Sequence, residues 1–330
     1  MAMVTAPTLT PESIFQLAQG FMASKLFFVA SEIGLFEQLA DGPRSAEEVA
    51  ANLRLPVRSV GLVANAMVAL GMLTLDRDRY RNSKIAQTFL AGRGSADMRP
   101  LLTFFNRLTY PQWDGLADTV RNDGQKDTTF DFSQEDQAIF SAGVEAASAG
   151  GAMALASSYD FGRHRNLLDI GGGTGSFLKI IGRQYPHLEL ALFELPKTAA
   201  FAHSRFTPND ATRIKIIEGD VLNSELPTGF DSLLLSHVIH CFSVVENRVV
   251  LKAAYDAARA GGRLLIVEFF LEDTKTAPVA CTLMSAEFLM NTRGIAYSMT
   301  EVRHLSEQVG WRFVEHRALA GPVSLMVLEK

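Results

Sequence analysis

A glycine-rich turn follows an apolar run in the middle of this 330-residue chain, within the segment LLDIGGGTGSF at 167–177. Asp169 precedes the turn, and Gly171 and Gly173 lie in it. Glycine residues, which have no Cβ atom, let the backbone bend sharply and let a ligand approach it closely. A dinucleotide-binding fingerprint would need glycine in place of Ser176, and a Walker phosphate loop would need Gly-Lys-Ser/Thr, which the turn lacks. The turn is therefore predicted to bind another kind of ligand.

The charge of Asp169 indicates which ligand this is. A carboxylate at the end of a strand attracts an amino group or a positive centre and repels pyrophosphate. Glu194 closes the next predicted strand, where an acidic residue can bind both hydroxyls of a ribose. Asp220 closes the third, where it can accept a hydrogen bond from an adenine amino group, with Val221 and Leu195 against the ring faces. Because ligands of open α/β sheets bind at the carboxyl ends of strands, these residues predict S-adenosylmethionine as the ligand.

The elements that must position these residues are short strands that alternate with amphipathic helices beyond residue 160. Examples are the strand NLLDI before the helix SFLKIIGRQY, and the strand FDSLLLS before the helix ENRVVLKAAYDAARA. This alternation is typical of a parallel sheet covered on both faces. The tail, WRFVEHRAL and GPVSLMVLEK, predicts an antiparallel hairpin at one edge of the sheet. The fold class is α/β, and the cofactor-binding domain is expected at 156–330.

Residues 1–155 are predicted to form a separate helical domain. Thr10 caps a first helix with the apolar stripe Ile14, Leu17, Ala18 and Phe21. A capping box at Ser45 opens a helix, which precedes a second helix and the strand–turn–strand segment MLTLDRDRYRNS, in a winged helix-turn-helix pattern. The second helix is too apolar to lie against DNA, and the segment at 26–39 is also apolar, which favours burial against another copy of the chain. Residues 121–136 are predicted to form a loop.

Composition argues against several classes of protein. The chain has 31 Lys and Arg against 36 Asp and Glu, so its net charge of -5 provides no general attraction for nucleic acid or an anionic membrane. The N-terminus lacks a signal peptide and the longest apolar runs are short, so no membrane segment is expected. Cys241 and Cys281 cannot form a disulfide framework, which indicates the cytoplasm. His237, His240 and Cys241 lie too close in sequence to converge easily on one ion, so no metal site is expected, and His164 is expected at the surface.

The order of the motifs LLDIGGGTG, LFELP, EGDV, SHVIHCFS and AGGRLLIVE resembles the small-molecule O-methyltransferases of the caffeate and hydroxyindole type, including bacterial members that act on natural products. The resemblance covers almost the whole chain, including YPQWDGL at 110–116. It implies a Rossmann-like class I methyltransferase sheet, S-adenosyl-L-methionine as cofactor with S-adenosyl-L-homocysteine as product, and a homodimer formed through a winged-helix N-terminal domain. The expected cofactor-binding residues are Asp169, Gly171, Gly173, Glu194, Leu195, Asp220 and Val221, with Val144, Ser148 and Ser236 at further positions.

The resemblance also implies a general base. The family's histidine, in a His-Asp-Trp motif, falls at His240, which is followed here by Cys241 and Phe242. An imidazole titrates near neutrality and can remove the proton of an acceptor hydroxyl. The family glutamate that orients this histidine falls at Glu268, and a second family glutamate falls at Ala296.

The expected function is therefore methyl transfer from S-adenosyl-L-methionine to a hydroxyl of an aromatic or polyketide-like small molecule. By resemblance and apolar character, the acceptor pocket is expected to contain Phe104, Phe105, Trp113, Phe140, Met284, Met290 and Asn291, with Tyr297 near its mouth. Three alternatives remain open: an N- or C-methyltransferase, a relative that binds the cofactor without transferring its methyl group, and a winged-helix transcription regulator that senses a ligand.

Overall fold

Contacts between residues divide the chain into two units in the computed structural model, which describes residues 10–94, 96–124 and 132–330. The first unit comprises residues 1–111 and 142–146, and the second comprises residues 112–141 and 147–330. This division differs from the expected boundary at residue 155. The reason is that the last turns of helix α9 (Gln134–Ser158) pack into the core of the second unit, where Leu155 is fully buried.

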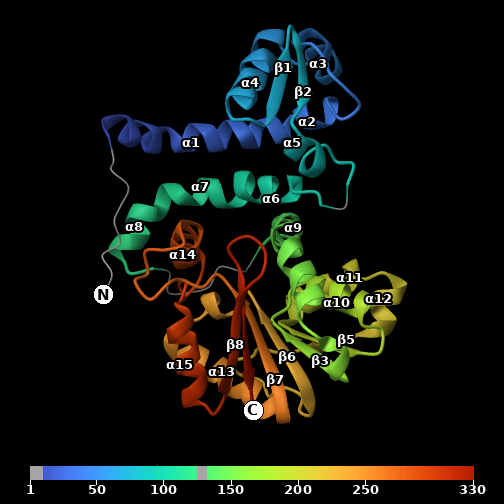
Figure 1. Cartoon of the computed structure of the whole chain (residues 1–330), viewed down its shortest axis with the longest axis vertical. Coiled ribbons are helices and arrows are strands. Elements are labelled where there is room, and N and C mark those ends of the chain that lie inside the picture. Colours follow the sequence, from blue (N-terminus) through green and yellow to red (C-terminus); the bar gives the residue numbers. More distant parts are fainter. Residues whose placement is uncertain (1–9, 95, 125–131) are drawn as a thin grey trace. The chain divides into compact units, whose positions relative to one another are not determined.

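The second unit is built on a seven-stranded sheet in the order β5-β4-β3-β6-β7-β9-β8 (Figure 1). Its strands are β3 (Asn166–Ile170), β4 (Glu189–Glu194), β5 (Ile214–Glu218), β6 (Phe230–Ser236), β7 (Ala258–Glu268), β8 (Arg312–Ala318) and β9 (Ser324–Glu329). The first five strands pair in parallel, whereas β9 pairs antiparallel with both β7 and β8. The predicted α/β class and the C-terminal antiparallel hairpin are thus confirmed.

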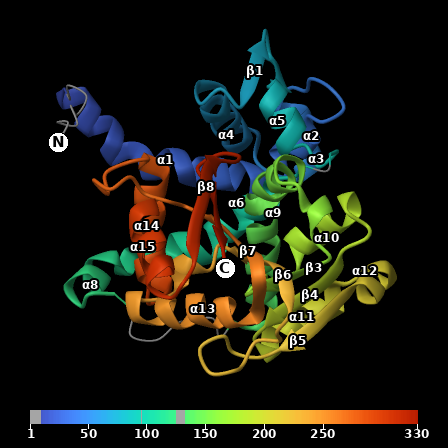
Figure 2. The same ribbon diagram turned by 60° about the horizontal axis from the view of Figure 1, so that its bottom comes forward.

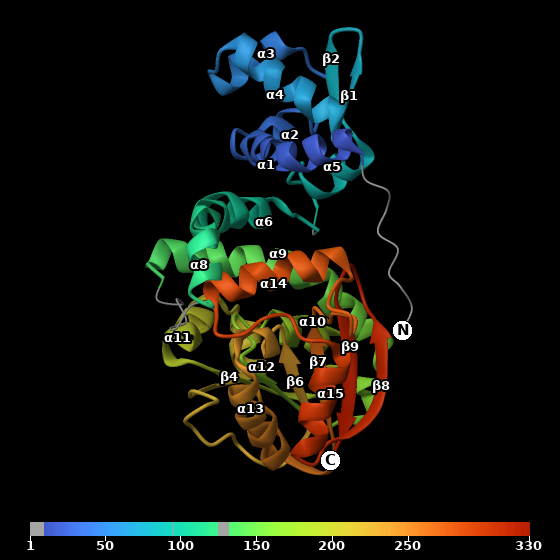
Figure 3. The same ribbon diagram turned by 90° about the vertical axis from the view of Figure 1, so that its left-hand side faces the viewer.

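Helices cover both faces of this sheet (Figure 2, Figure 3). They are α10 (Ser176–Gln184), α11 (Pro196–Arg205), α12 (Pro208–Arg213), α13 (Val244–Ala257) and α15 (Met299–Gln308). The second unit also contains α14 (Val279–Asn291) and the short turns η3 (Phe161–Arg163) and η4 (Ile239–Cys241). Successive strand residues point to opposite faces. Leu233 and Leu235 therefore join the core with α13 and α15, while Leu234 joins the core with α9 and α10. Burial on both faces explains why these strands are almost continuously apolar.

The second unit also contains η2 (Trp113–Gly115) and α8 (Leu116–Arg121). The predicted loop at 121–136 overlaps residues 125–131, which lie outside the described residues.

The first unit contains helices joined to a short hairpin. Its elements are α1 (Pro11–Glu32), α2 (Leu35–Gln38), α3 (Ala46–Leu53), α4 (Val57–Ala69), β1 (Leu73–Asp76), β2 (Arg79–Asn82), α5 (Lys84–Phe89), α6 (Arg99–Phe104) and the π-helical turn η1 (Phe105–Thr109), after which α7 (Tyr110–Gln112) crosses the division between the units. Thr10 and Ser45 cap α1 and α3 as predicted, each through a capping box. The stripe on α1 that includes Leu17 and Phe21 is exposed.

Three local predictions were wrong. The helix expected to continue to residue 260 ends at Ala257, because Ala258 pairs with Phe230 and begins β7. Asp220 does not close a strand but follows β5 by two residues. His164 is buried rather than at the surface, with its Nε2 atom 2.8 Å from the hydroxyl of Tyr159.

Two described helices, α1 and α9, are long and apolar enough to cross a membrane when judged by length and composition alone. The expectation of no membrane segment considered only uninterrupted apolar runs, and it overlooked these longer windows. They are weak evidence for a membrane segment because the core helix of a soluble protein passes the same test. The last turns of α9 are such core residues.

Candidate active site

The glycine-rich turn connects β3 to α10 in a conformation that only glycine adopts easily. Gly171, Gly173 and Gly175 have φ angles of 69°, 59° and 71°, in the left-handed region. Gly175 is the N-cap of α10. A Cβ atom on Gly172 would lie 2.2 Å from Oδ2 of Asp169, so the backbone closes tightly over this carboxyl group. The backbone of Gly172 therefore lies against the carboxyl group of Asp169.

Two buried carboxyl groups lie beneath this turn. Asp169 is fully buried, and neither of its carboxyl oxygens has a hydrogen-bond partner among the described residues. Burial, with a contribution from Glu194, raises the pKa of Asp169 to about 8. Glu194 accepts hydrogen bonds from the N–H groups of Gly173 at 2.9 Å and Leu195 at 2.8 Å, while burial raises its pKa. A ligand with a positive centre or hydrogen-bond donors would compensate the burial of these two carboxyl groups. They therefore fit the predicted S-adenosyl-L-methionine.

The other predicted cofactor residues follow the neighbouring strands. Asp220 lies in the loop after β5 and accepts hydrogen bonds from the Leu222 N–H and the Asn223 side chain. Val221 is half-buried beside it, and Ser236 is buried at the end of β6. Because β3, β4, β5 and β6 are parallel and adjacent, the residues that follow them gather at one edge of the sheet.

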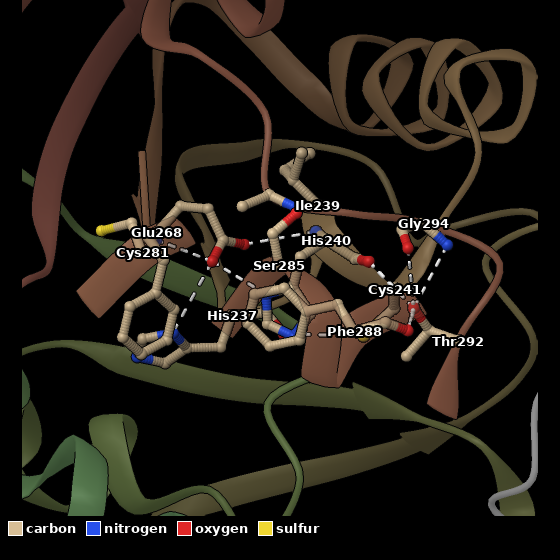
Figure 4. A network of polar contacts seen from close by, with 12 residues as sticks. His237, Ile239, His240, Cys241, Glu268, Cys281, Ser285, Phe288, Thr292 and Gly294 are labelled. Carbon is tan, nitrogen blue, oxygen red and sulfur yellow. Dashed lines mark hydrogen bonds and ion pairs between the residues drawn. The ribbon is translucent and has the colours of Figure 1, made fainter. Parts of the chain in front are cut away.

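His240 and Glu268 form a buried pair at the same edge (Figure 4). His240 lies in η4 after β6, and Glu268 is the last residue of β7. The parallel register that pairs Ser236 with Val267 brings the ends of these strands together. Nδ1 of His240 lies 2.8 Å from Oε1 of Glu268, and the His240 backbone N–H donates to Oε2 at 3.4 Å. The hydrogen bond to a carboxylate places a proton on Nδ1 and leaves Nε2 as the second nitrogen.

His240 and Glu268 each shift the pKa of the other. Burial alone would lower the pKa of His240, but the Glu268 carboxylate, with a smaller contribution from Cys241, raises it to about 10. Burial would raise the pKa of Glu268, but the neighbouring imidazoles of His240 and His237 hold it well below its usual range. The pair is therefore an ion pair in the absence of ligands.

A second imidazole approaches the same carboxylate. His237 has a φ of 59°, and its Nδ1 atom lies 3.8 Å from Oε1 of Glu268 with no hydrogen-bond partner among the described residues. Donor atoms of His237, His240 and Glu268 lie within 4.8 Å of one another, which is compatible with holding a metal ion. The absence of a metal therefore stays a prediction, and Cys241 is not part of this group.

Helix α14 supplies contacts to His240 that the sequence analysis missed. The ring of Phe288 is parallel to the His240 imidazole, with a centroid distance of 3.7 Å and an angle of 9°. The Thr292 hydroxyl donates to the backbone carbonyl of His240 at 3.1 Å. Met284, Phe288 and Asn291 are spaced four and three residues apart, so helical spacing was a signal that could have added Phe288 to the predicted pocket.

Several predicted acceptor residues gather around α14. Trp113 Nε1 donates to the Glu287 carboxylate at 2.6 Å, and the Asn291 side chain donates to it at 3.0 Å. Met290 is buried, and Met284 packs against a small core cluster. Phe140 is half-buried on α9, and its ring lies 5.0 Å from that of Phe132.

Tyr297 and Ala296 are both buried in the core. The hydroxyl of Tyr297, which was expected near the mouth of the acceptor pocket, donates to the backbone carbonyl of Phe242 at 2.7 Å, and its role in that pocket stays a prediction. Ala296, where the family's second glutamate was expected, is fully buried, and its N–H donates to the Ser285 hydroxyl. The structure therefore offers no carboxylate at position 296.

The remaining predicted residues are divided between the units. Phe104, Phe105 and Val144 belong to the first unit, and Ser148 is buried on the part of α9 that belongs to the second. Because the first three belong to a different unit from His240, their roles stay predictions.

Comparison with known proteins identifies the family. Residues 113–312 match the family model of an O-methyltransferase domain, and residues 15–92 match that of an O-methyltransferase dimerisation domain. The chain is 32% identical over 319 residues to the 3-hydroxy-5-methyl-1-naphthoate 3-O-methyltransferase of Streptomyces sahachiroi, covering 94% of this chain and 92% of the relative.

Two solved structures share the fold. The structure of PigF with SAH has a TM-score of 0.86 at 30% identity and covers 98% of this chain and 100% of PigF, an S-adenosyl-L-methionine-dependent methyl transferase of a Serratia species. Human N-acetylserotonin methyltransferase in complex with SAM has a TM-score of 0.89 at 23% identity, covers 99% of each chain, and shows the fold alone. These findings confirm the predicted class I methyltransferase fold, and the chain belongs to the O-methyltransferase family, with an O-methyltransferase domain and the family's dimerisation domain in one polypeptide.

Proposed function

We propose that this S-adenosyl-L-methionine-dependent O-methyltransferase methylates a hydroxyl of an aromatic or polyketide-like small molecule, with His240 as general base. The observation that carries this proposal is the buried hydrogen bond between His240 and Glu268 at the sheet edge that also holds the glycine-rich turn. The name of the Streptomyces relative, a hydroxynaphthoate 3-O-methyltransferase, supports an aromatic hydroxyl as the acceptor.

Asp169, Glu194, Asp220 and the glycine-rich turn would hold the cofactor, all within the second unit. When bound, S-adenosyl-L-methionine supplies an electrophilic methyl group on a sulfonium. The unsatisfied carboxyl of Asp169 supports this assignment because a cationic ligand would compensate its burial.

His240 removes the acceptor proton in this mechanism. Glu268 fixes the tautomer that carries a proton on Nδ1, so Nε2 is the atom that accepts the hydroxyl proton, and the carboxylate stabilises the imidazolium that forms. Because the ligand-free His240 imidazole is protonated at neutral pH, it must lose a proton before it can act as a base. The positive charge of a bound sulfonium would favour this loss by lowering the pKa of the imidazole. Alignment of the acceptor oxygen with the methyl group contributes about 7 to 11 kcal/mol in well-oriented reactions.

Substitution of His240 tests this role. We expect His240→Ala to lower kcat by about 10²- to 10⁴-fold, the usual contribution of general base catalysis. Cofactor affinity, measured by calorimetry, should change by less than about twofold, because His240 would act on the acceptor. Equal losses of turnover and cofactor affinity would contradict the assignment, and a retained rate would favour a nitrogen or carbon acceptor. If methyl-labelled cofactor yields no labelled product with hydroxyl, amine or carbon acceptors, the chain is a relative that does not transfer methyl groups.

We also propose that the chain forms a homodimer through its first unit and acts in the cytoplasm. The match to a dimerisation domain and the exposed stripe on α1 support the dimer. The two cysteines, which are free, support a reducing compartment. Salt-dependent binding of duplex DNA would instead favour the transcription regulator.

A further inference from the structure

The hydrogen bond to Glu268 does not by itself fix the plane of the His240 imidazole. Nδ1 and Oε1 are joined by one contact of 2.8 Å, and a ring held by one contact can turn about the line through those atoms. The backbone hydrogen bond from His240 to Oε2 restrains the main chain rather than the ring. A second contact is needed on a face of the imidazole to hold Nε2 in one direction.

Phe288 makes that contact. Its ring lies parallel to the imidazole at 3.7 Å between centroids, so rotation of the imidazole about the Glu268 contact would drive one ring into the other. By comparison, Phe269 meets the same imidazole at 6.4 Å and at an angle of 60°. Phe288 is therefore the aromatic ring that blocks this rotation.

Helix α14 is fixed to the backbone of the same turn. Beyond its last residue, the Thr292 hydroxyl, which has one proton to donate, lies 3.1 Å from the His240 carbonyl oxygen and 2.7 Å from that of Phe288. Gly294 approaches so closely that a Cβ atom there would lie 2.2 Å from the His240 carbonyl oxygen. The ring of Phe288 and the backbone of His240 therefore hold one relative position.

The titratable groups around the imidazole come from three elements. Glu268 approaches from β7, while His237 and Cys241 belong to the segment that carries His240 itself. Helix α14 contributes Cys281, whose thiol pKa is raised by burial and by the Glu268 carboxylate. Phe288 itself adds no charge. The negative face of an aromatic ring attracts a cation, so Phe288 favours the protonated imidazole over the neutral one.

We propose that Phe288 is a positioning residue for methyl transfer, which fixes the plane of the His240 imidazole and stabilises its protonated form. This inference rests on the proposed function of His240. Phe288 touches the base rather than the reacting atoms, so its loss acts through the direction and the basicity of Nε2.

The test compares Phe288→Leu with Phe288→Tyr and with Phe270→Leu, using the full chain and methyl-labelled cofactor with an aromatic hydroxyl acceptor that it methylates. Phe270 is as buried as Phe288, at 6% exposure, but its ring contacts His316 instead of His240. We expect Phe288→Leu to lower kcat at least about tenfold through lost alignment. The acid limb of its pH–rate profile should move down by about 0.5 to 1 pH unit through the lost cation–π contact. Phe288→Tyr should restore both quantities, and Phe270→Leu should match the unsubstituted enzyme.

Two results overturn the inference. One is a pH profile that does not move in Phe288→Leu. The other is a loss in Phe288→Leu that Phe288→Tyr does not restore. Thermal unfolding of each variant shows whether a lower rate comes from lost folding or from lost positioning. Where a variant is partly unfolded, the acid limb of the pH–rate profile, measured on the folded fraction, still decides the outcome. Failure of the proposed function is distinguishable, because His240→Ala would then retain turnover whatever Phe288→Leu does.

Discussion

Two buried carboxyl groups of this molecule have opposite electrostatic surroundings. Glu268 faces the imidazoles of His240 and His237, which hold its pKa well below the usual range in spite of burial. Asp169 faces no cation within the part of the chain that the structure describes, and burial with Glu194 nearby raises its pKa to about 8. Desolvation dominates where no opposite charge compensates it. Asp169 is thus neutral or partly protonated near neutral pH until a positively charged ligand arrives, which couples cofactor binding to the release of a proton.

The raised pKa of Asp169 predicts how stability depends on pH. A carboxyl group whose pKa in the folded protein lies above its ordinary value of 3.8 stabilises the fold fully at pH values below 3.8. This stabilisation is lost as the pH rises through about 8. Relative to Asp169→Asn, the cofactor-free protein should therefore lose stability between about pH 5 and about pH 8. We expect the difference in free energy of unfolding to change by at least about 1.4 kcal/mol, which corresponds to one pKa unit. Urea denaturation at the two pH values measures it.

Asp256→Asn is the control for this experiment, because Asp256 is exposed on α13 and pairs with Lys252 at the surface. An exposed pair of this kind contributes about 0 to 1 kcal/mol, so its substitution should leave the pH dependence nearly unchanged. A constant difference between the unsubstituted protein and Asp169→Asn at both pH values would show that Asp169 is ionised throughout.

The sequence predicted the elements that are defined by neighbouring residues. The glycine-rich turn, the cap at Ser45 and the alternation of strands with helices are local signals, and all were found. Contacts between residues far apart in the sequence were harder to predict. His240 and Glu268 are 28 residues apart and were paired only through a resemblance, whereas the register of β6 and β7 is what joins them. The helical spacing of Phe288 from Met284 and Asn291 could have added it to the predicted pocket. Its stacking on His240 had no local signal, because His240 lies on another element.

The close approach of Gly294 to η4 predicts a strong effect of a small substitution. In Gly294→Ala, the new Cβ atom would lie 2.2 Å from the His240 carbonyl oxygen and 2.5 Å from that of Phe242, so backbone must move. A displacement of about 1 Å at a catalytic group can reduce the rate about 10²-fold, and we expect a loss in kcat of this order. Steady-state kinetics and calorimetric titration with S-adenosyl-L-methionine separate this loss from cofactor binding, which should persist.

Gly115→Ala is the matched control, because, apart from the adjoining backbone, no atom of the described residues lies within 4 Å of a Cβ atom at that position. Its stability should stay within about 0.5 kcal/mol of the unsubstituted enzyme, as for most substitutions at unconstrained sites. If Gly294→Ala behaves like Gly115→Ala, the turn that carries His240 tolerates displacement, and tight packing against it is not required for turnover.

Assembly of two chains depends on a surface that one chain leaves uncovered. Leu17 is 83% exposed on α1, and Ile14 and Phe21 on the same stripe are also exposed. This stripe falls within or beside the residues that match the dimerisation domain. A contiguous exposed apolar surface is typical of an interface between proteins. The stripe belongs to the first unit, and the second unit has a hydrophobic core of its own.

Leu17→Glu tests whether this stripe is the dimer interface. Burial of a leucine side chain contributes about 1.5 to 3 kcal/mol, and an unpaired carboxylate in its place adds a desolvation cost, in both copies at once if the interface is symmetric. We therefore expect sedimentation velocity to show a dimer for the unsubstituted chain and a monomer for Leu17→Glu at the same concentration. Val245→Glu, which alters a residue of 68% exposure on α13 outside the dimerisation match, should remain dimeric. A dimer in both variants would place the interface on another surface, because a buried glutamate pair at position 17 could not be accommodated without loss of association.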